Sequence, residues 1–399
     1  MLDKATPPTL SLGLDEPSES FDLWSDAGYE IIEAKRRESR ENELAKRKPR
    51  TYTQVQATQL IGRSESFLKG KGLNDAWSDS GLPRYTLKRI NELRDKTGTR
   101  YRKPENVKPL TIALAKLKGG VGNSTICVHL AHYLATQGLK VLIVDLDLQA
   151  SASGLAAGVN PDVDFDKEDT VYEILRDAPM DFPSIVRYTY FENVLLAPCN
   201  SVMQNLEFEL VEQIQKDRSE WPKDEDGKPI SVYNRLSVGL KTIENEFDII
   251  LLDCPPALGT ITINALTAAD AMINTVRPNP LDRTSFAVFN SSLASLYESV
   301  PKPLRYYRIL INQMDRSRAS ELEENTIREI YGSYVLKNTV VESSEIKGAP
   351  SLMSTLFDLE KPVKSSNANR RAVDSMSRTF DEILTDIKAL WEMEAEDNG

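Results

Sequence analysis

The chain has 399 residues, of which 40% are hydrophobic and 27% charged, a composition that excludes a disordered protein. Its longest apolar runs are strand-sized, far below the roughly 18 residues of a membrane-spanning helix, which excludes a transmembrane segment. The net charge is −11, but residues 31–103 hold 19 Lys and Arg against 9 Asp and Glu, a net charge of +10. A basic segment in an acidic protein indicates a nucleic-acid surface or a solvated basic helix.

The three cysteines Cys127, Cys199 and Cys254 lie far apart and lack the spacing of metal ligands or of a disulfide framework. Free cysteines are typical of a reducing compartment. The N-terminal segment contains acidic residues and no apolar core of a secretory signal. We therefore expect a cytoplasmic protein that does not bind a membrane.

The first 49 residues are poor in apolar side chains. Residues 1–20 are rich in Pro, Ser and acidic residues and predict a flexible tail. Residues 21–49 are highly charged, and their sparse apolar positions, such as Ile31, Ile32 and Leu44, are compatible with one or two helices. A stripe this thin fits a helical arm that dimerises, and it fits a solvated arm nearly as well.

Residues 50–105 predict a helix-turn-helix DNA-binding domain. Apolar residues recur at helical spacing over 52–61, Gly62 stands at a helix C-cap position, and Ser64 can cap a second helix. In this motif the second helix enters the major groove of DNA. A strand or wing over 83–87 and another helix follow. An ordinary helical hairpin is the alternative, and the +10 charge around it favours DNA.

The candidate DNA contacts of this domain are polar or basic side chains. They come from the turn, the second helix and the wing, and they are Arg63, Ser64, Ser66, Lys69, Lys71 and Arg84.

Residues 106–399 predict an α/β nucleotide-binding domain. Strand-sized apolar runs occur at 110–115, 141–144 and 247–253. Near-continuous apolar strands that alternate with helices predict a parallel sheet covered on both faces. Such sheets bind ligands at the carboxyl ends of their strands, and the glycine-rich segment 118–125 and several aspartates lie there.

The glycine-rich segment predicts a phosphate site. The three glycines within 119–122 let backbone N–H groups surround an anion at the N-terminus of a helix expected at 126–137. Ser124 occupies the hydroxyl position that ligates Mg²⁺ in a P-loop. Thr125 can contact a phosphate oxygen.

Aspartates at the strand ends complete the predicted site. Asp253 follows the third strand and resembles a Walker B carboxylate that holds the metal through water. Asp145 and Asp147 follow the second strand, and one of them could orient the attacking water. The combination and its order predict a P-loop NTPase.

One position departs from the P-loop pattern G-x-x-x-x-G-K-[ST], because Asn123 stands where lysine is expected. That lysine is a point charge on the β- and γ-phosphates, and charge-assisted contacts are roughly twice as strong as neutral ones. Lys118 lies on the other side of the loop. Three interpretations stay open: a natural departure with a slow ATPase, an engineered change that traps a bound state, and a nucleotide-regulated DNA binder without turnover.

These motifs together resemble those of a known protein family. Residues 118–125 look like the deviant Walker A motif of the ParA/MinD group, and residues 144–152 resemble its D-x-D-P-Q-x-x-A segment with Leu148 in place of Pro. Residues 248–259 are similar to its Walker B block. The resemblance covers about residues 108–390, and the preceding helix-turn-helix makes the chain similar to the larger plasmid-type ParA subclass.

The resemblance implies a DNA-partition ATPase that uses ATP, ADP and Mg²⁺. The ATP form would be a homodimer, or a higher-order assembly on DNA, that binds DNA without sequence preference and is associated with the nucleoid. A ParB-type centromere-binding protein would stimulate hydrolysis, and the helix-turn-helix would repress the protein's own operon. Residues at the start of the C-terminal helix, Arg370 and Arg371, are candidates for the nonspecific DNA surface.

The resemblance also assigns roles by position. Lys118 would reach the partner's ATP, and the catalytic candidates are Lys118, Asp147 and Asp145, with Asp147 favoured as the carboxylate that orients water. The candidate metal ligands are Ser124, Asp253 through water, and Asp147. The nucleotide-binding candidates are Gly119, Gly120, Val121, Gly122, Asn123, Ser124, Thr125, Asp253 and Pro255.

Other function classes fit less well. A transcriptional repressor that turns over little ATP is the main alternative, because Asn123 replaces the P-loop lysine. A metabolic enzyme of the same group would need a substrate pocket or clustered cysteines. A membrane-binding relative would need an amphipathic C-terminal helix, and the acidic tail at 392–399 would be repelled by anionic lipid.

Overall fold

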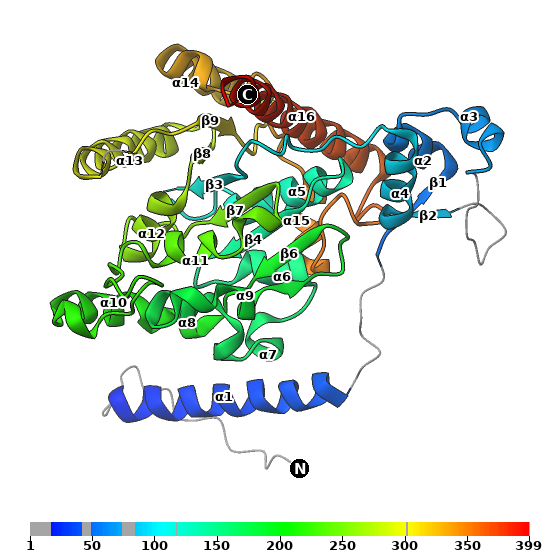
Figure 1. The fold of residues 1–399 in the computed structure, drawn as a ribbon. Helices are drawn as coiled ribbons and strands as arrows, with labels where there is room; N and C mark the ends of the chain where they lie inside the picture. Colours follow the sequence, from blue (N-terminus) through cyan, green and yellow to red (C-terminus); the bar gives the residue numbers. More distant parts are fainter. Residues whose placement is uncertain (1–16, 42–48, 74–83, 117, 301, 399) are drawn as a thin grey trace, which may run out of the picture.

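The computed structural model describes residues 17–41, 49–73, 84–116, 118–300 and 302–398, and a seven-stranded sheet lies at its centre (Figure 1). The strand order is β5-β6-β4-β7-β3-β8-β9, and every pair is parallel except β5 with β6. The strands are β3 (Leu110–Ala115), β4 (Val141–Asp145), β5 (Arg187–Tyr188), β6 (Val194–Ala197), β7 (Ile249–Asp253), β8 (Ala271–Val276) and β9 (Tyr306–Ile311). The expected parallel-sheet α/β fold is confirmed.

The apolar strands are buried on both faces. Every residue of β3, β4, β6, β7 and β8 is buried, and alternate side chains enter two separate hydrophobic clusters. On β3, for example, Leu114 packs into one cluster and Ala113 into the other. This arrangement explains why these strands read as continuous apolar runs rather than as alternating patterns.

Helices cover each face of the sheet (Figure 1). The helices on the first face are α5 (Asn123–Thr136), α6 (Ser151–Ala157), α15 (Ser344–Gly348) and α16 (Ser366–Asp397). Those on the second face are α8 (Val171–Arg176), α9 (Phe182–Ile185), α10 (Leu206–Gln215), α11 (Arg235–Lys241), α12 (Thr260–Ala268), α13 (Pro280–Ser299) and α14 (Arg318–Tyr331). Helix α5 begins three residues earlier than its apolar pattern predicts, so residues 123–125 of the P-loop form its first turn.

The charged N-terminal segment forms one helix, α1 (Pro17–Glu41), which lies beside the short helix α7 (Pro161–Asp164) in Figure 1. It begins within the region expected to be a tail, since residues 17–20 are already helical. The remainder of that predicted tail, residues 1–16, and the end of the predicted arm, residues 42–48, lie outside the described residues. Phe21, Leu23 and Trp24 are exposed on α1.

The expected helix-turn-helix elements are present. They are β1 (Thr51–Thr53), α2 (Gln54–Ile61), α3 (Glu65–Gly70), β2 (Arg84–Thr86) and α4 (Leu87–Thr97). Gly62 ends α2 with φ of 73°, and the Ser64 hydroxyl accepts a hydrogen bond from the Phe67 N–H, so both predicted caps are confirmed. Strand β2 pairs with β1 in antiparallel register, which supplies the wing expected after the second helix.

This N-terminal unit shares its core with the sheet domain. Ile61, Leu68 and Ile90 belong to the same hydrophobic cluster as the buried faces of α5 and α16. The guanidinium of Arg94 donates to the carbonyl of Leu60 and also to that of Thr136, the last residue of α5, at 2.8 and 2.7 Å. The unit formed by α2, α3 and α4 is therefore packed against the sheet domain.

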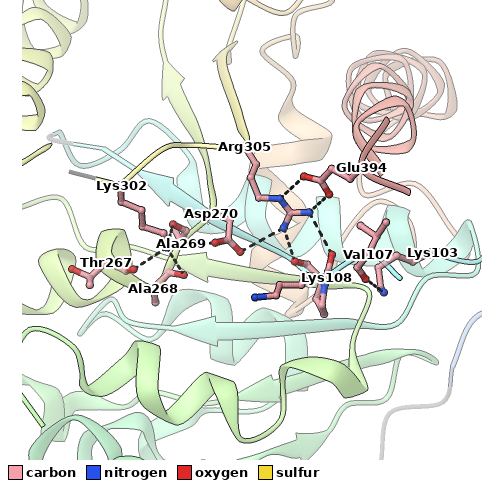
Figure 2. A network of polar contacts seen from close by, with 11 residues as sticks. Lys103, Val107, Lys108, Thr267, Ala268, Ala269, Asp270, Lys302, Arg305 and Glu394 are labelled. Atoms are coloured by element: carbon pink, nitrogen blue, oxygen red, sulfur yellow. Dashed lines mark hydrogen bonds and ion pairs between the residues drawn. The ribbon is translucent and has the colours of Figure 1, made fainter. Parts of the chain in front are cut away.

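Two basic side chains, Arg305 and Lys302, form polar contacts near the amino ends of the strands (Figure 2). Arg305 lies just before β9, and its guanidinium pairs with Glu394 of α16 and donates to the carbonyl of Pro109 at 3.0 Å. Lys302 donates to three carbonyls at the end of α12 and so satisfies groups that the helix leaves unpaired.

None of the described helices combines the length and the apolarity that crossing a bilayer requires.

Candidate active site at the carboxyl edge of the sheet

Three neighbouring strands bring the predicted site residues to one edge. Strand β7 lies between β3 and β4, so the P-loop after β3 and the aspartates that end β4 and β7 are adjacent. Asp145 pairs in register with Asp253, and Leu114 pairs with Asp253 on the other side. The convergence expected from the strand ends is therefore present in the structure.

The P-loop backbone is held by the loop that follows β9. The side chain of Asn312 donates to the Val121 carbonyl at 2.7 Å, and that of Gln313 donates to the Gly120 carbonyl at 3.2 Å. Gly122 has φ of 82°, and a Cβ there would stand 2.7 Å from the Asn312 amide nitrogen, so only glycine fits. The loop opens α5, whose N-terminal N–H groups and dipole favour an anion.

A cavity of about 170 Å³ adjoins the loop. Its lining residues are Gly122, Thr125, Asn312, Gln313, Val341, Glu342, Ser343, Ile346, Lys347 and Pro350. The cavity lies on the β9 side of the P-loop, where a group attached to a bound phosphate could extend.

Asn123 directs its side chain into the protein. It is 1% exposed, and its amide nitrogen donates to the Leu114 carbonyl at 2.8 Å and to an Asp253 carboxylate oxygen at 3.0 Å. Its amide oxygen accepts from the Thr275 hydroxyl at 3.2 Å. The side chain of Asn123 therefore forms its hydrogen bonds inside the protein, and this P-loop position carries no positive charge.

Asp253 has the features of a ligand for a hard cation. The residue is completely buried, and one carboxylate oxygen accepts the bond from Asn123 while the other has no hydrogen-bond partner among the described residues. Burial raises the pKa of Asp253 above its usual range, and the nearby charge of Lys116 counteracts part of that rise. Ser124 lies half-buried in the first turn of α5. A free carboxylate oxygen and this hydroxyl fit the oxygen ligands that Mg²⁺ prefers.

Asp145 and Asp147 have different surroundings. Asp145 accepts bonds at 2.7 Å from both the N–H and the hydroxyl of Ser153, and one at 3.1 Å from the Asp147 N–H. Burial, followed by the charge of Asp253, raises the pKa of Asp145. Both oxygens of Asp145 therefore hold the backbone after β4. An oxygen of Asp147 instead lies 3.3 Å from the Lys116 ammonium nitrogen.

Lys118 is held by an acidic partner within the chain. Its ammonium forms an ion pair with Asp282, at the start of α13, and Arg277 pairs with the same carboxylate. Burial alone would raise the pKa of Asp282, but the hydrogen bonds from Arg277 and Lys118 outweigh it and hold that pKa below its usual range. The side chain of Lys118 remains 37% exposed.

Sequence reasoning missed Lys116 and the pairing of Lys118 with Asp282. The signal for Lys116 was a lysine placed between an apolar strand and the glycine loop. No sequence signal indicated the second contact, because Lys118 and Asp282 are 164 residues apart. Pro255, another predicted contact, is half-buried two residues beyond the end of β7.

Five of the six predicted DNA contacts of the N-terminal unit are exposed. Arg63, Ser64, Ser66, Lys69 and Lys71 are exposed, whereas Arg84 on β2 is half-buried. Lys69 pairs with Glu65 across one turn of α3, and the Arg63 guanidinium lies over the Phe67 ring. A basic surface of this kind can meet phosphates.

Arg370 and Arg371 are exposed in the first two turns of α16. Arg371 lines a cavity of about 330 Å³ together with Arg316, which lies in the loop after β9. Neither Arg370 nor Arg371 forms an ion pair within the part of the chain that the structure describes, so both charges are available.

The histidines and cysteines pack rather than form a site. His129 and His132 on α5 are completely buried, and the His132 ring stacks on Phe191 with centroids 3.9 Å apart. Cys254 is a buried free thiol beside Asp253, as expected of a small core residue.

Comparisons with known proteins agree with this geometry. Residues 110–306 match a protein family described as "AAA domain". Protein SopA of Escherichia coli K12 is 31% identical over 317 residues, covering 77% of this chain and 79% of SopA. The chromosome-partitioning ATPase Soj of Thermus thermophilus is 28% identical over 267 residues, covering 66% of this chain and 94% of Soj.

A solved structure described as "Partition Protein" has the same fold over most of the chain. The TM-score is 0.64 at 16% identity, and the match covers 94% of this chain and 98% of that protein. This likeness concerns the fold, whereas the sequence relatives carry the family assignment.

Proposed function

The chain belongs to the ParA family of partition ATPases, and on that premise we propose that it binds DNA in an ATP-dependent manner and segregates a replicon together with a ParB-type centromere-binding protein. The observation that carries the proposal is the meeting of an anion-binding P-loop with Ser124, Asp147 and Asp253 at one sheet edge. These are the parts that phosphoryl transfer needs, because its catalysis is mostly positioning and electrostatic stabilisation.

The proposed roles follow from what each side chain already contacts. The N–H groups at the start of α5 would hold the phosphates, and Ser124 together with the unpaired oxygen of Asp253 would hold Mg²⁺. Bound Mg²⁺ would neutralise charge that develops on the phosphates. Asp147 orients the attacking water, since the oxygens of Asp145 are engaged by Ser153 and by the Asp147 N–H.

Two surfaces are proposed to bind DNA. The exposed side chains of the turn after α2, of α3 and of its C-cap would read an operator, which would give the protein a way to repress its own operon. Arg370 and Arg371 would contact phosphates without sequence preference in the ATP-bound dimer. In that dimer Lys118 would exchange Asp282 for the partner's ATP.

A repressor that binds nucleotide with little turnover is the second candidate function. The observation that favours it is the inward side chain of Asn123, which leaves the usual P-loop position without a cation. Loss of a direct phosphate cation slows transfer, because charge stabilisation is usually the largest catalytic contribution.

Measurements of ATP binding and DNA-stimulated hydrolysis on the full chain separate the two candidates. We expect ATP to bind and DNA to accelerate hydrolysis, and we expect Ser124→Ala to lose the Mg²⁺ dependence of both. Binding without turnover, with turnover gained in Asn123→Lys, would favour the repressor. Absence of ATP binding in both the unaltered chain and Asn123→Lys would contradict both candidates.

A further inference from the structure

Lys116 is a buried lysine at the carboxyl edge of the sheet, beside the P-loop. It directly follows β3, and it is the only lysine that is buried within the described part of the chain. Its side chain is 7% exposed, and its ammonium nitrogen lies 3.3 Å from an oxygen of Asp147. A buried ammonium loses much of its hydration, so such lysines are rare unless a charged partner or a function retains them.

The charges around Lys116 are unbalanced. Asp145, Asp147 and Asp253 are all buried at the same edge, and Lys116 is the buried cation among them. The Asn123 amide faces the interior, and Lys118 is paired with Asp282. Before nucleotide binds, the catalytic edge therefore has one internal cation, and that cation is held by the carboxylate proposed to orient water.

We propose that Lys116 is the phosphate-binding cation of this site and replaces the lysine that the P-loop lacks at Asn123. The inference rests on the proposed ATPase function. In the nucleotide-free protein Lys116 neutralises Asp147. When ATP and Mg²⁺ bind, the ammonium turns to the phosphates and leaves Asp147 free to accept a hydrogen bond from water.

The position of Lys116 permits this exchange. Lys116, Lys118 and Val121 line one small cavity, so the ammonium-bearing chain runs beside the P-loop. Four methylene groups and three rotatable donors let a lysine change partners without backbone movement. A triphosphate carries more negative charge than a single carboxylate, which favours the exchange once ATP is present.

A purely structural role for Lys116 makes a different prediction. If it served only to neutralise buried carboxylates, its loss would lower stability and would affect ATP, ADP and adenosine alike. A phosphate cation instead discriminates between these ligands by the number of phosphates that they carry.

The test compares two variants that differ only at this cation. Asp147→Asn removes the carboxylate partner and is expected to retain ATP binding, and Asp147→Asn/Lys116→Gln then removes the cation without leaving an unpaired charge. Equilibrium binding of fluorescent ATP, ADP and adenosine analogues with Mg²⁺ is measured on the full chain, with thermal unfolding as the check on folding. We expect about a 10-fold or greater loss of ATP affinity in the double variant, a smaller loss for ADP and none for adenosine.

Adding Asn123→Lys to the double variant is expected to recover most of the lost ATP affinity, whereas the neutral control Asn123→Gln is not. Equal ATP affinity with and without Lys116, equal losses for all three ligands, or no recovery with Asn123→Lys would overturn the proposal for Lys116. If the unaltered chain and Asp147→Asn both fail to bind ATP, the proposed function itself fails, which is a distinguishable result.

Discussion

Asp145 and Asp147 differ in the polar groups that their carboxylate oxygens contact. Asp145 holds the Ser153 N–H, the Ser153 hydroxyl and the Asp147 N–H, whereas Asp147 faces the Lys116 ammonium and accepts one backbone bond from Gln149. The first carboxylate fixes the backbone after β4. Asp147 faces a lysine side chain, which can rotate to another partner. We therefore propose that Asp147 is the carboxylate that accepts a water molecule.

Replacement of each aspartate by asparagine separates these roles. We expect Asp147→Asn to retain ATP binding and to slow hydrolysis at least about 100-fold, because a neutral amide cannot orient and polarise water as a carboxylate does. Asp145→Asn should retain a much larger share of the rate, since asparagine still offers an acceptor to Ser153. Single-turnover hydrolysis checks both, and equal inactivity of two folded variants would contradict the assignment.

We expect His129 of α5 to make the unfolding free energy depend on pH. Its Nε2 accepts from the Leu356 N–H at 3.1 Å, so the ring is neutral and its Nδ1 donates to the Thr125 carbonyl at 2.7 Å. Burial lowers the pKa of His129 to about 4, and the Thr125 bond offsets only part of that shift. A histidine in the unfolded chain titrates near 6.5, so the unfolded state binds a proton first as the pH falls.

The stability that neutral His129 provides is therefore present above about pH 6.5 and is lost as the pH falls toward 4. Between pH 7.5 and 5 we expect the unaltered chain to lose about 2 kcal/mol more unfolding free energy than His129→Gln loses. Denaturant unfolding at the two pH values measures this difference. Parallel pH profiles for the two proteins would show that His129 does not titrate as described.

At the scale of elements, the α2–α3 unit has the caps, the turn and the strand pair that the sequence predicts, and Arg63, Lys69 and Lys71 are exposed on it. We expect Lys69→Gln/Lys71→Gln to weaken DNA binding by the apo or ADP form and to reduce the dependence of log K on log salt by about two phosphate contacts. The control is Lys228→Gln, a change in an exposed loop lysine that pairs with Asp226. Fluorescence anisotropy with DNA at several salt concentrations measures both effects. If the control and the double variant give the same slope, α3 is not the contact.

The elements were predictable where local pattern decides them. Runs such as 110–115 are buried from end to end, and Gly62 and Ser64 act through neighbours within a few residues, so sequence alone placed them. The start of α5 was placed too late, because residues 123–125 carry no apolar periodicity and are helical through the P-loop geometry. The tail was expected to extend to residue 20, but α1 already begins at Pro17.

Contacts between distant segments were not predictable. The inward orientation of Asn123 depends on Leu114, Thr275 and Asp253, which reach it from three different strands. The Lys118–Asp282 pair is formed in the same way by tertiary structure. Sequence therefore identified the chemical groups of the site, while the partners that tune those groups required the fold.

At the scale of the whole molecule, α5 joins the sheet edge that carries the P-loop to the N-terminal unit of α2, α3 and α4. Its first turn belongs to the P-loop, and its last carbonyl, that of Thr136, accepts from Arg94 of α4. Burial, followed by the charge of Arg100, lowers the pKa of Arg94 to about 10, which still leaves it charged at neutral pH.

Removal of the Arg94 guanidinium should loosen this junction. We expect Arg94→Met to lower the unfolding free energy by about 2–4 kcal/mol, because the carbonyls of Leu60 and Thr136 would lose a charged donor. The exposed Arg102→Met serves as the control and should change stability by less than about 1 kcal/mol. Urea unfolding measures both, and a loss no larger in Arg94→Met than in the control would refute the junction.

We propose that this chain is a nucleotide-controlled DNA-binding ATPase, and DNA binding in different nucleotide states tests that proposal most directly. The affinity of the full chain for a DNA fragment without an operator would be measured with ATP and Mg²⁺, with ADP and Mg²⁺, and without nucleotide. We expect at least about 10-fold tighter binding with ATP, loss of that gain in Arg370→Gln/Arg371→Gln, and a longer-lived ATP complex in Asp147→Asn, which is expected to bind ATP and to hydrolyse it slowly. Equal affinity in all three nucleotide states, with ATP shown to be bound, would contradict the account.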